Sequence, residues 1–149
     1  AALVVSGILG GSGGRLFKVV REEEGLCYRI GAGWHPAKGL FVVEAGVDPS
    51  QERRARRLIQ ALVRDVAAGS LDEAAHRAFL EGAAHGVRAL VDDRAGRVGW
   101  LQESRTLGLD PSPRAHLRAL GAVTPAAVGR VGRRLGLEAT FALRPREGA

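Results

Sequence analysis

Apolar residues in the first part of this chain follow the spacing of helices. Residues 1–9 are apolar almost throughout and run into a series of glycines, a pattern that we interpret as the end of a buried helix. Residues 15–24 predict a second, short helix that ends at Gly25, because glycine is the preferred residue just after a helix. One side of this short helix carries Leu16, Phe17 and Val20.

The spacing then changes from helical to alternating, which predicts a β-hairpin. Residues 26–34 alternate, residues 35–39 have the composition of a turn, and residues 40–47 are rich in β-branched residues. The two strands are therefore expected to pair with each other. One face of the first strand is expected to carry Tyr28, Ile30, Ala32 and Trp34, and the other Cys27, Arg29, Gly31 and Gly33.

Most of the remaining chain is predicted to be helical. Asp48 has the place of a cap for a long helix that ends near residue 69, and Ser70 with Glu73 forms the capping pattern of the next helix, to about residue 91. The expected buried stripe of the long helix consists of Ala55, Leu58, Ile59, Leu62, Val63 and Val66. Further helices are expected over residues 94–108, over 114–120 and from Pro125 onward.

A last alternating segment, residues 137–143, predicts a third strand, and the resulting order of elements predicts an α+β fold class. Two strands, several helices and a strand suit a two-layer sandwich in which helices cover one face of a largely antiparallel sheet. A chain of 149 residues suits one domain. Three strands make a thin sheet and the chain contains no methionine, so we expect residues 1–149 to be a single partial domain whose opening strands lie elsewhere.

The charge and composition exclude several classes of protein. The net charge is +6, but the arginines alternate with acidic residues along the predicted helices, which is typical of a solvated surface. We therefore expect no nucleic-acid partner, although a basic RNA-binding module stays an alternative. No apolar run reaches the ~20 residues of a membrane span. Cys27 is the only cysteine, and we expect a cytoplasmic location; the prevalence of arginine, alanine and glycine is typical of a bacterial source.

The histidines give no metal site. His76 and His85 lie too far apart in sequence to share one helix face at the one-turn spacing of ligands, and the pattern H-x-x-E-H is absent. The run Gly10, Gly11, Ser12, Gly13 and Gly14 formally fits G-x-S-x-G, the turn that presents the serine of an α/β-hydrolase. The order of elements contradicts that fold. We interpret the run either as a glycine loop that cradles a peptide or as a simple connector.

Arg21 and Tyr28 are the best candidates for chemistry. They lie on either side of Gly25, so a helix and a strand bring their side chains toward one region from two elements. Guanidinium and phenol both donate hydrogen bonds, which suits a peptide carbonyl that gains negative charge during reaction. The alternatives are an ion pair between Arg21 and a nearby glutamate, and a half-buried hairpin position for Tyr28.

These segments together resemble the insulinase and pitrilysin superfamily of inverted zinc peptidases, which includes the mitochondrial processing peptidase. Residues 8–33, ILGGSGGRLFKVVREEEGLCYRIGAG, are similar to the glycine loop, helix start and Arg/Tyr segment of that family. Similarity continues at residues 39–51, 70–83 and 123–135. Two positions depart from the family pattern: Gly14 stands where serine is frequent, and Ala75 or His76 where a lysine is usual.

The resemblance implies a role in peptide cleavage. Such enzymes join two homologous halves around a chamber: one half holds zinc, and the other carries the Arg/Tyr pair and the glycine loop. The resemblance therefore implies that this chain is the Arg/Tyr half, a metallopeptidase component that is inactive alone, binds peptide and pairs with a zinc-bearing half in a dimer or larger assembly. Arg21 and Tyr28 would bind the substrate carbonyl and the oxyanion, and the glycine loop would bind substrate. The alternative is a non-catalytic scaffold or peptide-binding subunit of the same superfamily.

Overall fold

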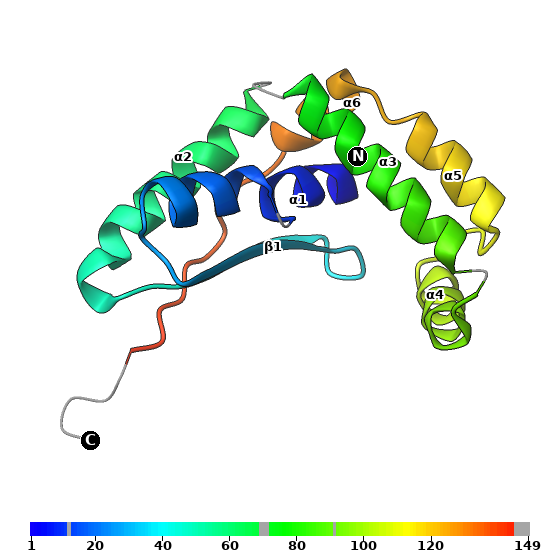
Figure 1. Cartoon of the computed structure of the whole chain (residues 1–149), viewed down its shortest axis with the longest axis horizontal. Coiled ribbons are helices and arrows are strands. Elements are labelled where there is room, and N and C mark those ends of the chain that lie inside the picture. Colours follow the sequence, from blue (N-terminus) through cyan, green and yellow to red (C-terminus); the bar gives the residue numbers. More distant parts are fainter. Residues whose placement is uncertain (12, 69–71, 91, 145–149) are drawn as a thin grey trace.

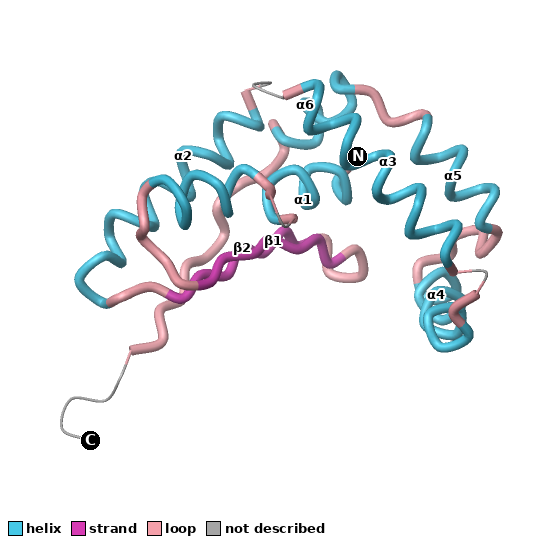
Figure 2. The backbone as a smooth tube through the Cα atoms, in the orientation of Figure 1, coloured by secondary structure: helices cyan, strands magenta, loops and turns pink. Residues whose placement is uncertain are grey.

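In the described part of the chain, helices lie over one face of a β-hairpin and none lies over its other face; together the helices form an arch (Figure 1). The computed structural model describes residues 1–11, 13–68, 72–90 and 92–144. Figure 2 shows that helices make up most of the path of the chain. The elements are α1 (Ala2–Gly10), η1 (Phe17–Glu23), β1 (Arg29–His35), β2 (Leu40–Gly46), η2 (Pro49–Gln51), α2 (Glu52–Ala67), α3 (Glu73–Ala89), α4 (Arg94–Thr106), α5 (Pro113–Gly121) and α6 (Pro125–Gly132). The α+β class is thus confirmed.

α1 lies at the centre of the core because it is apolar on every side. It packs on β1 beneath it and on α3 and α6, and Val4 and Leu9 are fully buried. α2 contributes a single apolar stripe, of which Ala55, Leu62 and Val66 are the most buried members. The stripe predicted for this helix is therefore confirmed. Other core side chains are Val5, Ile8, Leu16, Val20, Leu26, Ile30 and Val128.

The hairpin pairs β1 with β2 in antiparallel register, and the register fixes which residues share a face. Ile30 opposes Ala45 and Ala32 opposes Val43, and all four belong to the core or pack against it. Their neighbours along each strand point away from the helices. We call this second set the uncovered face of the hairpin. It consists of Arg29, Gly31, Gly33 and His35 on β1 and Leu40, Val42, Glu44 and Gly46 on β2.

Some of the helix caps are the residues that the sequence predicted. Asp48 accepts a hydrogen bond from the Ser50 N–H at 2.9 Å, as expected. The cap of α3 is Asp72, whose carboxylate accepts from the Ala74 N–H at 2.8 Å, whereas Ser70 lies outside the described residues. Proline begins α6, as predicted, and the Thr124 side chain caps it.

The third strand predicted over residues 137–143 is absent. This segment has no regular secondary structure and pairs with no strand among the described residues, and the side chain of Phe141 is 90% exposed. A strand is defined by its ladder, so alternation alone does not make one where no neighbouring strand lies beside it. The sheet is thus two-stranded in the described part of the chain. Within the same residues, no helix has both the length and the apolar character needed to cross a bilayer.

Trp100 joins α4 to the segment that contains α5. The Trp100 indole N–H donates to the Pro111 carbonyl at 3.0 Å, and its ring meets the His116 ring edge-on at 4.5 Å. Burial lowers the pKa of His116 below its ordinary value of 6.5, with the Glu103 carboxylate acting in the opposite direction. The unfolded chain therefore takes up the proton more readily than the folded one.

We expect stability to fall as the pH drops through 6.5, because the proton favours the unfolded chain at that site. Urea unfolding at pH 7.5 and pH 5.5 measures this loss. The variant His116→Gln should lose part of the pH dependence, whereas His85→Gln on the exposed side of α3 should retain it. Equal pH dependence in both variants and the wild type would contradict the assignment.

Candidate functional site

Arg21 lies on a π-helix rather than on the α-helix expected from the sequence. In η1 the hydrogen bonds at its end span five and six residues, from the Glu24 N–H to the Val19 carbonyl and from the Leu26 N–H to the Val20 carbonyl. Widened turns of this kind occur frequently at functional sites. Gly25, with φ of +59°, then reverses the chain toward β1.

The guanidinium of Arg21 is exposed and held by stacking. Its central carbon lies 4.8 Å from the centroid of the Phe17 ring, one helical turn earlier. The sequence left open an ion pair between Arg21 and a nearby glutamate. The described residues show no such pair, and Glu24 pairs with Arg54 instead. Stacking uses the flat face of the guanidinium and leaves its N–H edge available to a ligand.

Cys27, the neighbour of Tyr28 in sequence, is buried. Burial raises the pKa of the Cys27 thiol, and the positive charge of Arg21 acts against this rise. Among the described residues no hydrogen bond joins the Arg21 and Tyr28 side chains.

Tyr28 points out of the core, contrary to the face predicted for it. Its side chain is 72% exposed, whereas Ile30 on the same predicted face is buried. The reason lies in the pairing. The Tyr28 N–H donates to the Gly46 carbonyl at 3.0 Å, although Gly46 is the ladder partner of Arg29. Two residues of one strand thus oppose one residue of the other, as in a β-bulge, a feature that re-aims side chains next to active sites.

The Tyr28 ring lies over Gly46. A Cβ placed on Gly46 would come within 2.5 Å of the phenol oxygen and of the ring carbons beside it. Because the Cβ of a residue at this position would point to the uncovered face, the phenol stands on that face too. Glycine at position 46 is therefore needed to leave room for the Tyr28 ring. The sequence pattern did not indicate this requirement.

The glycine loop joins α1 to η1, and most of its glycines have packing roles. A Cβ on Gly10 would lie 2.3 Å from the Ala32 backbone nitrogen, so glycine lets α1 touch β1. A Cβ on Gly14 would press on the Leu9 carbonyl, and the Gly11 N–H caps α1 by donating to the Gly7 carbonyl. Gly13 differs: its φ is +90° and its Cβ position faces open space. Ser12 lies outside the described residues.

The loop and Tyr28 lie along the same strand. Gly10 touches β1 at Ala32, four residues from Tyr28, which corresponds to about 13 Å of extended chain. Ala32 belongs to the face of β1 that packs against the core, whereas the Tyr28 ring stands on the uncovered face. The structure therefore does not gather the predicted site residues at one point, and Arg21 lies on η1 rather than on the strand.

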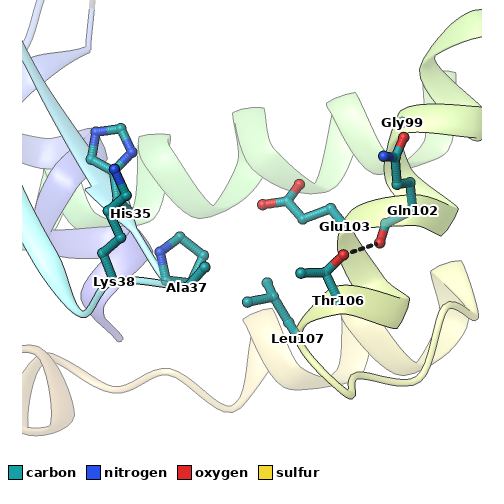
Figure 3. Close-up of a pocket in the computed structure, with 9 residues that line it drawn as sticks. His35, Ala37, Lys38, Gly99, Gln102, Glu103, Thr106 and Leu107 are labelled. Carbon is teal, nitrogen blue, oxygen red and sulfur yellow. Dashed lines mark hydrogen bonds between the residues drawn. The ribbon is translucent and has the colours of Figure 1, made fainter.

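A groove that the sequence did not indicate lies at the other end of β1 (Figure 3). It has a volume of about 350 Å³ and lies between the hairpin turn and α4. In the figure Glu103 projects from α4 toward the side on which His35 and Lys38 lie. Neither Arg21 nor Tyr28 lines it. Only the fold brings these two distant segments together, so no local pattern could have revealed the groove.

The histidines do not form a metal site in the described part of the chain. No group of three or more histidine, cysteine, aspartate or glutamate side chains is placed to hold an ion there. His76 departs from the surface position expected of a helix histidine: it is 7% exposed, and its Nε2 has no hydrogen-bond partner among the described atoms. The described residues therefore do not fit a zinc ion.

The fold defines the class of the chain: an α+β domain in which helices cover one face of an antiparallel hairpin. A family model described as the peptidase M16 inactive domain matches residues 1–79. The chain therefore belongs to the peptidase M16 family, in agreement with the predicted superfamily and non-zinc half.

A sequence relative agrees with this assignment, and two solved structures share the fold. An uncharacterized zinc protease of Streptomyces coelicolor is 41% identical over 105 residues, which cover 68% of this chain and 18% of that protein. A protease of Helicobacter pylori has a TM-score of 0.79 at 13% identity, and a conserved protein of Enterococcus faecalis has 0.77 at 23%. Each match covers 89% of this chain and about a third of the solved one, 33% and 32% respectively. The chain thus spans only part of the length of these relatives.

Proposed function

We propose that this chain is the substrate-holding half of a zinc-dependent metalloendopeptidase that cleaves extended peptides. The observation that carries the proposal is the position of Tyr28. Its N–H pairs off-register with the Gly46 carbonyl, and its ring lies outside the core on the uncovered face of the hairpin. The exposed phenol of Tyr28 can donate a hydrogen bond to a ligand.

In this proposal Tyr28 and Arg21 are catalytic residues. The Tyr28 hydroxyl donates to the scissile carbonyl oxygen as it becomes an oxyanion, and Arg21 binds a substrate carbonyl nearby. Donors placed in advance for a developing negative charge stabilise the transition state more than the ground state. The metal that activates water belongs to the partner half, since the described residues of this chain do not fit one.

The glycine loop is proposed to approach the substrate backbone. Gly13 supports this, because its Cβ position faces open space and its φ is accessible mainly to glycine. Gly10, Gly11 and Gly14 are proposed to border the peptide while serving the packing described above. Ser12 is included in this proposed substrate-binding loop on the family resemblance alone.

The proposed assembly follows from the incompleteness of the site. As a single partial domain of the Arg/Tyr type, residues 1–149 require a zinc-bearing homologous half, in the same polypeptide or in a separate subunit, as a dimer or larger assembly. We propose a cytoplasmic location on the cysteine content alone. The chain by itself is expected to cleave nothing.

A second candidate function is a non-catalytic scaffold or peptide-binding subunit. It is favoured by the family model, whose description is an inactive domain. The two functions make different use of Tyr28: a scaffold requires the surface of the hairpin but no hydroxyl at that position.

The test combines this chain with a zinc-bearing homologous half and follows cleavage of a fluorescence-quenched decapeptide. We expect cleavage only in the mixture and loss of cleavage on addition of a chelator. Replacing Arg21 with alanine should lower turnover while the zinc content of the complex stays constant. A complex that forms and binds the decapeptide without cutting it would favour the scaffold, and cleavage by this chain alone would contradict the proposal.

A further inference from the structure

The outer side of α2 carries a row of arginines that the packing of the core leaves in solvent. Arg53, Arg57 and Arg64 are all exposed. At about 3.6 residues per turn they fall within about 40° of one another around the helix axis, on the side opposite to the buried Leu62 and Val66. The helix rises about 16 Å between the first and the last of them. We call this row the arginine stripe.

The acidic residues of α2, and Glu24 beside it, all pair with arginines outside the stripe. The pairs are Glu24–Arg54, Asp65–Arg15, Glu52–Arg56 and Glu52–Arg144. No ion pair in the described part of the chain includes a residue of the stripe. The Nε of Arg64 donates to the Gln60 carbonyl at 3.2 Å, which uses one of the five N–H donors of that guanidinium. The stripe therefore presents positive charge that the described residues do not neutralise.

The stripe is costly to the helix and narrow. Arg53 and Arg57 are one turn apart, and like charges at that spacing destabilise a helix slightly. A ligand of opposite charge removes this repulsion. On one side the stripe is bordered by the carboxylates of Glu24 and Asp65, and on the other by that of Glu52. These borders favour an anion that is no wider than a single row of acidic groups.

We propose that the arginine stripe binds an acidic α-helix of a partner protein. Such a helix, laid along α2, presents its carboxylates in a row at the same spacing of three to four residues. Each guanidinium can then hold a carboxylate through two parallel hydrogen bonds. A nucleic acid fits less well, because its broad phosphate backbone meets the bordering carboxylates and α2 contains no aromatic residue on which a base could stack. The inference is independent of the proposed function, since neither Arg21 nor Tyr28 belongs to the stripe.

The experiment measures binding of fluorescein-labelled helical peptides to the full chain by anisotropy. Two alanine- and glutamine-rich peptides contain the same four glutamates, which one peptide places in a row along one helix face and the other distributes around the helix. We expect tighter binding of the first peptide at low salt, and weaker binding as salt is added. Replacing Arg53, Arg57 and Arg64 together with glutamine should weaken binding of the first peptide about tenfold, a size that the loss of three exposed ion pairs can reach.

A matched variant controls for the general loss of charge. Arg94, Arg97 and Arg105 on α4 are also exposed, and replacing all three with glutamine removes the same charge from another part of the surface. This variant should bind the first peptide as the wild type does. Equal weakening by both triple variants, or equal affinity for the two peptides, would overturn the assignment to the stripe. Tighter binding of a single-stranded RNA of the same net charge would replace the acidic helix with a nucleic acid, and absence of binding by either peptide would also overturn the inference.

Discussion

Replacing Tyr28 with phenylalanine is expected to lower kcat/KM of the assembled peptidase about 100-fold, the effect of removing one donor from an oxyanion site. The ring itself should stay in place, because it lies over Gly46 and its hydroxyl forms no hydrogen bond with a described residue. The substitution therefore removes a donor without removing packing. The loss should appear in kcat as much as in kcat/KM, since the interaction is made in the transition state.

Peptide cleavage by the reconstituted complex measures this effect, with zinc content and urea unfolding as checks. Phe141→Leu is a suitable control because Phe141 is also an exposed aromatic residue but lies in the C-terminal segment. Its activity should match the wild type. Full activity of Tyr28→Phe would contradict the catalytic role and leave only the scaffold function.

Replacing Gly10 with alanine is expected to destabilise the fold by about 3 kcal/mol, the upper range for an overpacked core position. The added Cβ would lie 2.3 Å from the Ala32 nitrogen and 2.7 Å from its Cα, and backbone atoms cannot turn aside as a side chain can. α1 would have to move away from β1. Because α1 lies at the centre of the core, the loss of packing should lower the stability of the whole fold.

Urea unfolding followed by circular dichroism measures this loss. Gly82→Ala on α3 is the matched control, because nothing lies within 4 Å of its added Cβ. That variant should be as stable as the wild type or more so, by up to about 1 kcal/mol, the difference in helix propensity between the two residues. Equal stability of Gly10→Ala and the wild type would show that α1 and β1 do not touch as described.

The sequence predicted the elements wherever local patterns decide them. The apolar stripe of α2, the hairpin and Pro125 at the start of α6 were all read from spacing and capping residues. The third strand failed because a strand requires a neighbour, and residues 137–143 have none among the described residues. Alternation reports which side chains share a face and carries no information about whether a second strand is present.

The sequence proposed residues for the candidate site but could not indicate their geometry. The π-helical turn of η1 depends on backbone hydrogen bonds that the spacing of apolar residues does not predict. The outward turn of Tyr28 depends on its pairing with Gly46, a contact between segments 18 residues apart in the printed sequence. The buried position of His76 likewise follows from packing in the folded chain. Roles for Arg21, Tyr28 and the glycine loop stay predictions until activity is measured.

The central claim is that a peptide lies on the uncovered face of the hairpin beside Tyr28. The most direct test is an NMR titration of the isotopically labelled chain with an unlabelled decapeptide. We predict that the backbone amide signals of Tyr28, Gly31, Gly33 and Gly46 shift together as the peptide is added. Shifts confined to Gly99, Gln102 and Thr106 of the α4 groove, with the hairpin signals unchanged, would contradict it.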